Sequence, residues 1–96
     1  MDYKTIHEAR TALKLAETAT MEQIKRNYRT LMKQWHPDHC SDSPEKCKEM
    51  ARKITEAYRI ILDYCANYRF SFTPEEVENY LSEEEFWDQR FGSDPI

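Results

Sequence analysis

The sequence predicts an all-α protein: two antiparallel helices with a shorter helix before them and an additional helix after them. The 96 residues contain one glycine and four prolines, and many are Glu, Lys, Arg, Ala or Leu, a composition typical of helices. Apolar residues recur at helical spacing both before and after residues 36–43. Pro37 lies between these two patterns, and a proline ends a helix at or before the preceding residue. The chain therefore reverses direction near Pro37.

The first two helices are predicted from their start signals. Residues 3 to about 15 form the first, because Asp2 is a typical N-cap residue and an apolar stripe follows it. Thr20 and Gln23 form a capping-box pattern, so the second helix begins near Met21 and ends at about Trp35. The apolar stripes of these two helices are Ile6, Ala9 and Leu13 in the first, and Ile24, Tyr28, Leu31 and Trp35 in the second.

Two more helices are predicted in the second half of the chain. The third runs from about Pro44 to Tyr68, because proline suits the first turn of a helix and a long apolar stripe follows. The last begins at Thr73, whose cap is followed by a proline at the first helical position. A second capping box at residues 82–85 predicts that this helix breaks and restarts. The third helix carries the longest stripe: Cys47, Met50, Ala51, Ile54, Ala57, Tyr58, Ile61 and Cys65.

Charge divides the chain into two parts. The net charge is −4, but residues 1–35 carry +3 and residues 71–96 carry −7. We therefore expect a helical domain of residues 1–70 and an acidic C-terminal helical extension of residues 71–96, packed on the domain or tethered to it. No apolar run approaches the roughly 20 residues that cross a bilayer, and the N-terminus lacks a signal-peptide core. We expect a cytoplasmic protein without a membrane partner.

The cysteines are three in number, and an odd number without a secretion signal predicts no disulfide framework. Cys47 and Cys65 fall on the apolar stripe and are predicted to be small core residues, whereas Cys40 lies in the turn. A zinc set of Cys40, Cys47, His36 and His39 is conceivable, but its spacing matches no usual finger or ribbon. We predict no metal and no cofactor.

The second helix carries a basic face. Lys25, Arg29 and Lys33 stack at i, i+4 and i+8, Arg26 lies beside them, and Glu22 is the one acidic residue among them. A run of charge is usually a solvated face. Here it leads into an exposed turn, which favours a surface that binds a partner.

These residues resemble the J-domain of DnaJ-type co-chaperones. The resemblance covers residues 5–68 and rests on residues 24–38, IKRNYRTLMKQWHPD, and on residues 54–58, ITEAY. It implies a hairpin of the second and third helices with the first packed across it. It also implies a protein that is not an enzyme but binds a DnaK-class heat-shock chaperone and stimulates its ATP hydrolysis. By position, the chaperone-binding residues are His36, Pro37, Asp38, Lys25, Arg26, Tyr28, Arg29 and Lys33.

The chain departs from the family pattern at two places. Residues 8–14 lack the leucine-glycine that in the family usually precedes the connection between the first and second helices. The shape of this first connection is therefore left open. No glycine-phenylalanine linker, cysteine zinc region or substrate-binding domain follows the hairpin, so the chain resembles a minimal J-protein of the third class. The acidic extension could inhibit the basic face, cap the helical bundle, or recruit a client or partner protein through its aromatic residues Phe86, Trp87 and Phe91.

Two other function classes compete with this interpretation. A small helical DNA-binding module would explain a basic helix, but the whole chain is acidic and the helix offers few base-reading side chains besides Asn27 and Gln34. A hydrolase would need His36, Asp38 and Cys40 to act together, and residues so close in sequence seldom form a triad. We therefore expect neither a nucleic-acid partner nor catalysis.

Overall fold

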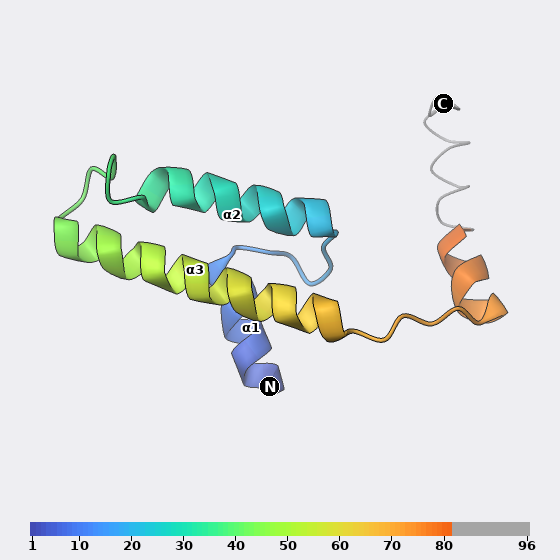
Figure 1. Ribbon diagram of the computed structural model, residues 1–96. Coiled ribbons are helices and arrows are strands. Elements are labelled where there is room, and N and C mark those ends of the chain that lie inside the picture. The colour runs from blue at the N-terminus through green and yellow to red at the C-terminus, as the bar shows by residue number, and fades with distance from the viewer. Residues whose placement is uncertain (82–96) are drawn as a thin grey trace, which may run out of the picture.

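The computed structural model describes residues 1–81, and this part of the chain is all-α. The helices are α1 (Tyr3–Ala12), α2 (Met21–Trp35) and α3 (Pro44–Asn67), and residues 74–81 form a further helical segment. In Figure 1, α2 and α3 lie side by side as an antiparallel hairpin, and α1 packs across α3. The predicted fold class is confirmed. No helix within residues 1–81 is both long enough and apolar enough to cross a membrane.

The hydrophobic core lies where the three helices meet. Leu13 and Ile54 are its most deeply buried large side chains, with exposed fractions of 0% and 1%. The ring of Tyr28 stacks on the ring of Tyr58, with centroids 3.9 Å apart, and so joins α2 to α3. The predicted apolar stripes therefore face one another. The other buried members of the core are Ala9, Ile24, Leu31, Ala57 and Ile61.

The helix starts follow the predicted capping patterns. The Asp2 carboxylate accepts a hydrogen bond from the backbone N–H three residues later at 2.9 Å. Thr20 and Gln23 make both hydrogen bonds of a capping box, at 3.1 and 2.8 Å. α3 begins with Pro44 in its first turn, after a cap from Ser43. These bonds satisfy N–H groups that have no partner inside a helix.

The end of α1 differs from the prediction. The helix stops at Ala12 and not near residue 15, because Lys14 adopts a left-handed backbone with φ 55°. The N–H of Leu15 donates to the carbonyl of Arg10 at 3.0 Å, and the N–H of Lys14 donates to that of Thr11 at 3.0 Å. This pattern closes a helix and normally takes a glycine at the left-handed position. The first connection thus keeps the shape that a glycine would favour, although a lysine is present.

The prediction that the cysteines form no disulfide is wrong. Cys40 and Cys47 are bonded to each other, with Cα atoms 6.1 Å apart, and Cys65 is a free, half-buried thiol. Cys47 is buried as expected, but it is a half-cystine outside the main core cluster. The odd count argued against a disulfide framework, yet one pair can form because the turn after α2 carries residue 40 back to the first part of α3.

Residues 68–73 lead from α3 to the helical segment of residues 74–81 (Figure 1). The backbone carbonyl of Thr73 accepts from the N–H of Val77 at 3.1 Å, in keeping with the predicted start of the last helix. The Phe72 side chain is 85% exposed. The second capping box at residues 82–85 and the aromatic residues Phe86, Trp87 and Phe91 lie outside the described residues.

Candidate functional site

The His36-Pro37-Asp38 sequence forms the turn at the tip of the hairpin, where α2 ends. The N–H of His36 donates to the carbonyl of Met32 at 2.8 Å, and His36 itself is extended, with φ −61° and ψ 132°. That conformation is expected of a residue before proline. Pro37 and Asp38 are exposed, and the Asp38 side chain is 85% exposed. The turn is therefore presented to solvent.

Hydrogen bonds within residues 36–40 fix the shape of this turn. The carbonyl of His36 accepts from the N–H groups of His39 and Cys40, at 3.1 and 2.9 Å. The N–H of Asp38 donates to Nδ1 of His36 at 3.1 Å, so the neutral imidazole carries its proton on Nε2. Nδ1 also lies 3.6 Å from the Asp38 carboxylate, a contact that becomes an ion pair only if Nδ1 is protonated. His36 therefore hydrogen-bonds within the turn, a point that the sequence left open.

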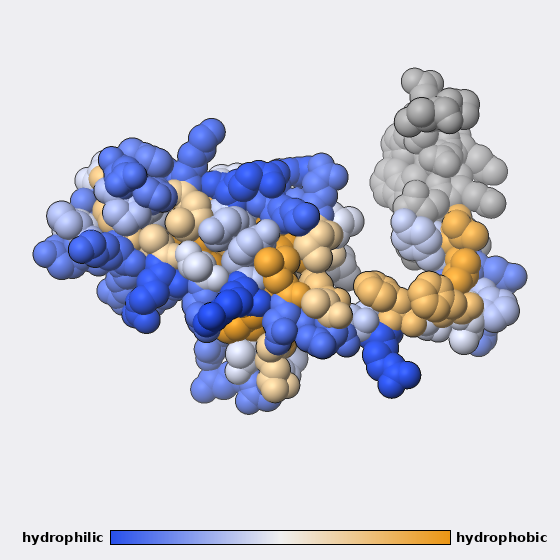
Figure 2. Space-filling view, viewed as in Figure 1, coloured by the Kyte–Doolittle hydropathy of each residue, from blue (hydrophilic) through white to orange (hydrophobic). Residues whose placement is uncertain are grey.

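The four basic residues predicted on α2, Lys25, Arg26, Arg29 and Lys33, are all exposed; we call them the basic face. Arg26 pairs with Glu22, one helical turn away, at 3.4 Å. In residues 1–81 the other three make no ion pair within 4.0 Å. Figure 2 shows hydrophilic side chains over α2, in contrast to the hydrophobic side chains near the end of α3. Within the described residues, Lys25, Arg29 and Lys33 therefore have no acidic partner.

Two other residues of α2 have structural contacts. Tyr28, a predicted site residue, is half-buried with its ring on Tyr58, so it joins the hairpin beneath the exposed surface. The side-chain amide of Asn27 donates to the carbonyls of Leu13 and Lys14, at 2.9 and 3.1 Å. Sequence reasoning missed this contact, because nothing local marks it. The amide is one of the two base-reading groups that a DNA-binding module would need, and the first connection already occupies it.

The first residues of α3 complete the tip. The N–H of Ser43 donates to the Asp42 carboxylate at 2.8 Å, and this bond is the main reason why the pKa of Asp42 lies below its usual 3.8. Lys46 lies 3.5 Å from the same carboxylate and also places its ammonium 5.7 Å from the centre of the Trp35 ring. The start of α3 is thereby linked to the end of α2.

The disulfide changes what the nearby residues can do chemically. In the disulfide-bonded form, Cys40 is not a free thiolate and cannot serve as the nucleophile of a hydrolase. The same bond removes two of the four residues of the conceivable zinc set, Cys40 and Cys47. Among residues 1–81, no group of three or more His, Cys, Asp or Glu side chains is arranged to hold a metal ion.

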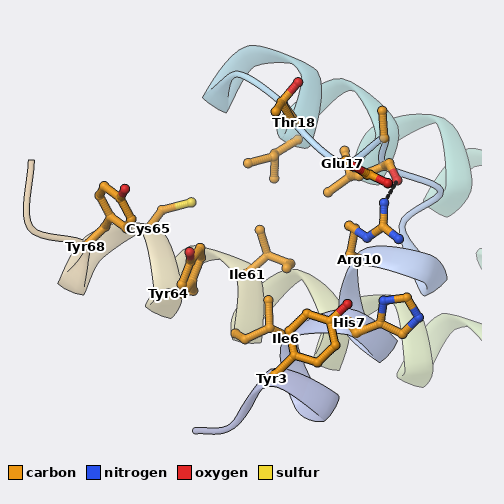
Figure 3. A pocket seen from close by; sticks show the side chains of 14 residues that line it. Tyr3, Ile6, His7, Arg10, Glu17, Thr18, Ile61, Tyr64, Cys65 and Tyr68 are labelled. Carbon is orange, nitrogen blue, oxygen red and sulfur yellow. Dashed lines mark hydrogen bonds between the residues drawn. The ribbon is translucent and has the colours of Figure 1, made fainter. Parts of the chain in front are cut away.

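A separate hollow lies at the other end of α3. It is lined by α1, the first connection and the C-terminal turns of α3, and the guanidinium of Arg10 donates to the carbonyl of Leu15 there at 3.3 Å (Figure 3). Its α3 residues begin at Ile61, fourteen residues beyond Cys47. At 1.5 Å per residue these points are about 20 Å apart. The hollow therefore does not belong to the site at the tip.

An exposed His-Pro-Asp turn at the tip of an antiparallel hairpin, next to a basic helix and with a shorter helix across the base, defines a J-domain. The family model described as DnaJ domain matches residues 6–68. The chain belongs to the DnaJ domain family.

Individual relatives share the domain over a small part of their length. The chaperone protein DnaJ of Thermotoga petrophila is 40% identical over 45 residues, which are 47% of this chain and 12% of that protein. The DnaJ protein P58IPK homolog A of Oryza sativa subsp. japonica is 38% identical over 58 residues, which are 60% of this chain and 12% of that protein. The chain thus spans about an eighth of these relatives. No solved structure matches it.

Proposed function

We propose that this chain is a co-chaperone that binds a DnaK-class chaperone in the cytoplasm and stimulates its ATP hydrolysis. The observation that carries the proposal is the exposed His36-Pro37-Asp38 turn beside the basic face of α2. In this role the chain regulates the reaction of its partner and is not itself an enzyme.

The turn offers three different contacts to a partner. The exposed Asp38 carboxylate can form charge-assisted hydrogen bonds with an arginine. Pro37 has a fixed φ and adds a rigid apolar wedge. Nδ1 of His36 is already occupied by the N–H of Asp38, so Nε2–H is the group left to donate across the interface.

The basic face supports the same proposal. Lys25, Arg29 and Lys33 are exposed and have no ion pair in residues 1–81, so docking on an acidic surface would break no ion pair between them and these residues. Complementary charge speeds diffusional encounter and fixes the register of two surfaces. The basic face would therefore orient the chaperone while the turn makes the specific contact.

Steady-state ATPase of a DnaK-class chaperone, with and without this protein, tests the proposal. We expect wild-type protein to raise the rate, and His36→Gln or Asp38→Asn to abolish the rise with helix content unchanged. His7→Gln and Asp63→Asn are matched controls, because both residues are exposed and lie away from the tip. Stimulation by the two tip variants at the wild-type level would contradict the proposed function.

The basic face is tested by charge reversal. Lys25→Glu with Arg29→Glu should weaken chaperone binding about tenfold or more, and wild-type binding should fall as salt rises, because 0.1 M salt screens exposed charges over about 10 Å. Lys48→Glu with Arg52→Glu makes the same change in charge at the same spacing on α3. If both double variants weaken binding equally, only net charge matters and the basic face is not the docking surface.

The acidic extension, residues 71–96, is proposed to be a separate unit that recruits a client or partner protein through Phe86, Trp87 and Phe91. Its described part exposes Phe72, and clustered exposed apolar side chains usually mark an interaction site. Deleting residues 71–96 should leave chaperone affinity and Tm unchanged while capture of the client is lost. Tighter chaperone binding would indicate inhibition of the basic face, and a lower Tm would indicate that the extension caps the bundle.

A further inference from the structure

We propose that the Cys40–Cys47 disulfide is a reversible thiol–disulfide site that controls the His36-Pro37-Asp38 turn. The bonded form holds the turn ready for the chaperone, and the reduced form binds the chaperone more weakly. The binding effect rests on the proposed function, whereas the effect on the turn itself does not.

The position of the bond connects it directly to the turn. Cys40 lies two residues after Asp38, and Cys47 is the fourth residue of α3. The N–H of Cys40 donates to the carbonyl of His36 at 2.9 Å. A continuous link therefore runs from α3 through the disulfide and Cys40 to His36.

Apart from the disulfide, little ties residues 36–43, the connection between α2 and α3, to α3. Residues 37–39 and 41–43 are exposed, and Cys47 lies outside the main core cluster although it is 2% exposed. The contacts of Asp42 and Ser43 stabilise the start of α3 itself. Lys46 over the Trp35 ring is a second link across the tip, but it joins the two helices and not the turn. Cleavage of the disulfide would leave the turn with contacts among its own residues: its local hydrogen bonds, the contact of His36 with Asp38, and the stacking of the His36 ring on the His39 ring with centroids 5.4 Å apart.

The two sulfur atoms differ in a way that suits exchange. Cys40 is partly exposed and Cys47 is buried, so an external dithiol would attack Cys40 Sγ, form a mixed disulfide there and release Cys47 as a thiolate. The second thiol of the reductant then breaks the mixed disulfide. Two electrons and two protons pass to the cysteine pair, and the dithiol becomes a disulfide.

The proposed cytoplasmic location favours a reversible bond over a purely structural one. Disulfides in a reducing compartment are rare, and those that occur are usually transient, catalytic or redox-sensing. The remaining thiol, Cys65, is eighteen residues beyond Cys47 on α3, about 27 Å away at 1.5 Å per residue. Cys65 therefore cannot compete for either partner within the folded chain.

Affinity for the ATP-bound chaperone, measured with oxidised and reduced protein, tests the proposal. The full chain carries Cys65→Ser, so that the pair contains the only thiols, and dithiothreitol is the reductant. We expect reduction to raise Kd about three- to tenfold, because the partner must then order the turn on binding. The matched control adds Cys40→Ser and Cys47→Ser; it should bind like the reduced form, and dithiothreitol should not change its Kd. Equal Kd values for oxidised and reduced protein would overturn the proposal.

Amide hydrogen exchange at residues 38–40 gives a readout that needs no chaperone. We expect exchange to become at least tenfold faster on reduction, while the amides of α1 keep their rates. If neither the oxidised nor the reduced protein binds the chaperone, the proposed function is wrong. The exchange rates then test by themselves whether the disulfide controls the turn. Unchanged rates at residues 38–40, or free thiols at Cys40 and Cys47 after treatment with a disulfide oxidant, would overturn it.

Discussion

The two connections of the hairpin bundle are built in opposite ways. The first, residues 13–20, is anchored in the core at its start, because Leu13 is fully buried and Asn27 donates to the carbonyls of Leu13 and Lys14. The second, residues 36–43, has no buried side chain and is held by short-range hydrogen bonds and the disulfide. Both connections expose most of their residues, but only the first contributes a side chain to the buried core.

This difference separates stability from recognition. Leu13, with Leu15 packed beside it, is part of the core cluster that contains residues of all three helices, so a change at Leu13 affects the packing of the whole domain. No side chain of the second connection is buried, and the Asp38 side chain is 85% exposed, so a change at Asp38 should have little effect on folding. Substitutions at Leu13 or its partners should therefore change the stability of the domain, whereas substitutions at Asp38 should change recognition and leave stability almost unaltered.

Leu13→Ala should cost about 2–5 kcal/mol of unfolding free energy, because it leaves a cavity where three helices meet. Urea denaturation measures the loss. Leu81→Ala removes the same atoms from a side chain that is 49% exposed and should cost much less. Equal losses would show that the first connection is not part of the core.

Asn27→Ala should cost about 1–3 kcal/mol, because the carbonyls of Leu13 and Lys14 lose a partner in a partly buried place. Gln34→Ala, at an exposed position on the same helix, should change the unfolding free energy by no more than about 0.5 kcal/mol. The two variants can be compared by thermal unfolding. A neutral Asn27→Ala would mean that the first connection does not need its link to α2.

Lys14→Gly should stabilise the protein by about 1 kcal/mol, because it relieves the left-handed backbone of a residue with a Cβ atom. For a domain of this size, that gain would raise Tm by about 4–8 °C. Lys33→Gly, within α2, should destabilise by a similar amount, since glycine is a poor helix former. A loss of stability in both variants would contradict the proposed strain at Lys14.

Asp38→Asn should leave the unfolding free energy within about 0.5 kcal/mol of wild type, because the side chain is 85% exposed. The same variant is expected to abolish stimulation of the chaperone's ATP hydrolysis. Asp38→Asn would then remove function without changing stability, which is the opposite of the effect expected for Leu13→Ala. Calorimetry and ATPase can be measured on one preparation. A large drop in Tm would mean that the tip stabilises the domain and does more than present a recognition site.

The sequence alone determined the helices and the exposed turn, because both depend on residues that are close in the chain. Capping bonds and apolar stripes join positions three or four apart, so Thr20 with Gln23 sufficed to find the start of α2. Pro37 sufficed to find its end, since proline constrains the residue before it. The exposure of the basic face followed from helical periodicity in the same way.

Only the tertiary structure decided the contacts between segments. The amide of Asn27 meets the carbonyls of Leu13 and Lys14 because α2 packs beside the first connection, and no local pattern encodes that pairing. The left-handed Lys14 is tolerated because the surrounding bonds close the helix around it. The pairing of Cys40 with Cys47 depends on the path of the turn back to α3, which brings their Cα atoms to 6.1 Å. A count of cysteines carries no information about that path, and for this reason the disulfide was predicted wrongly.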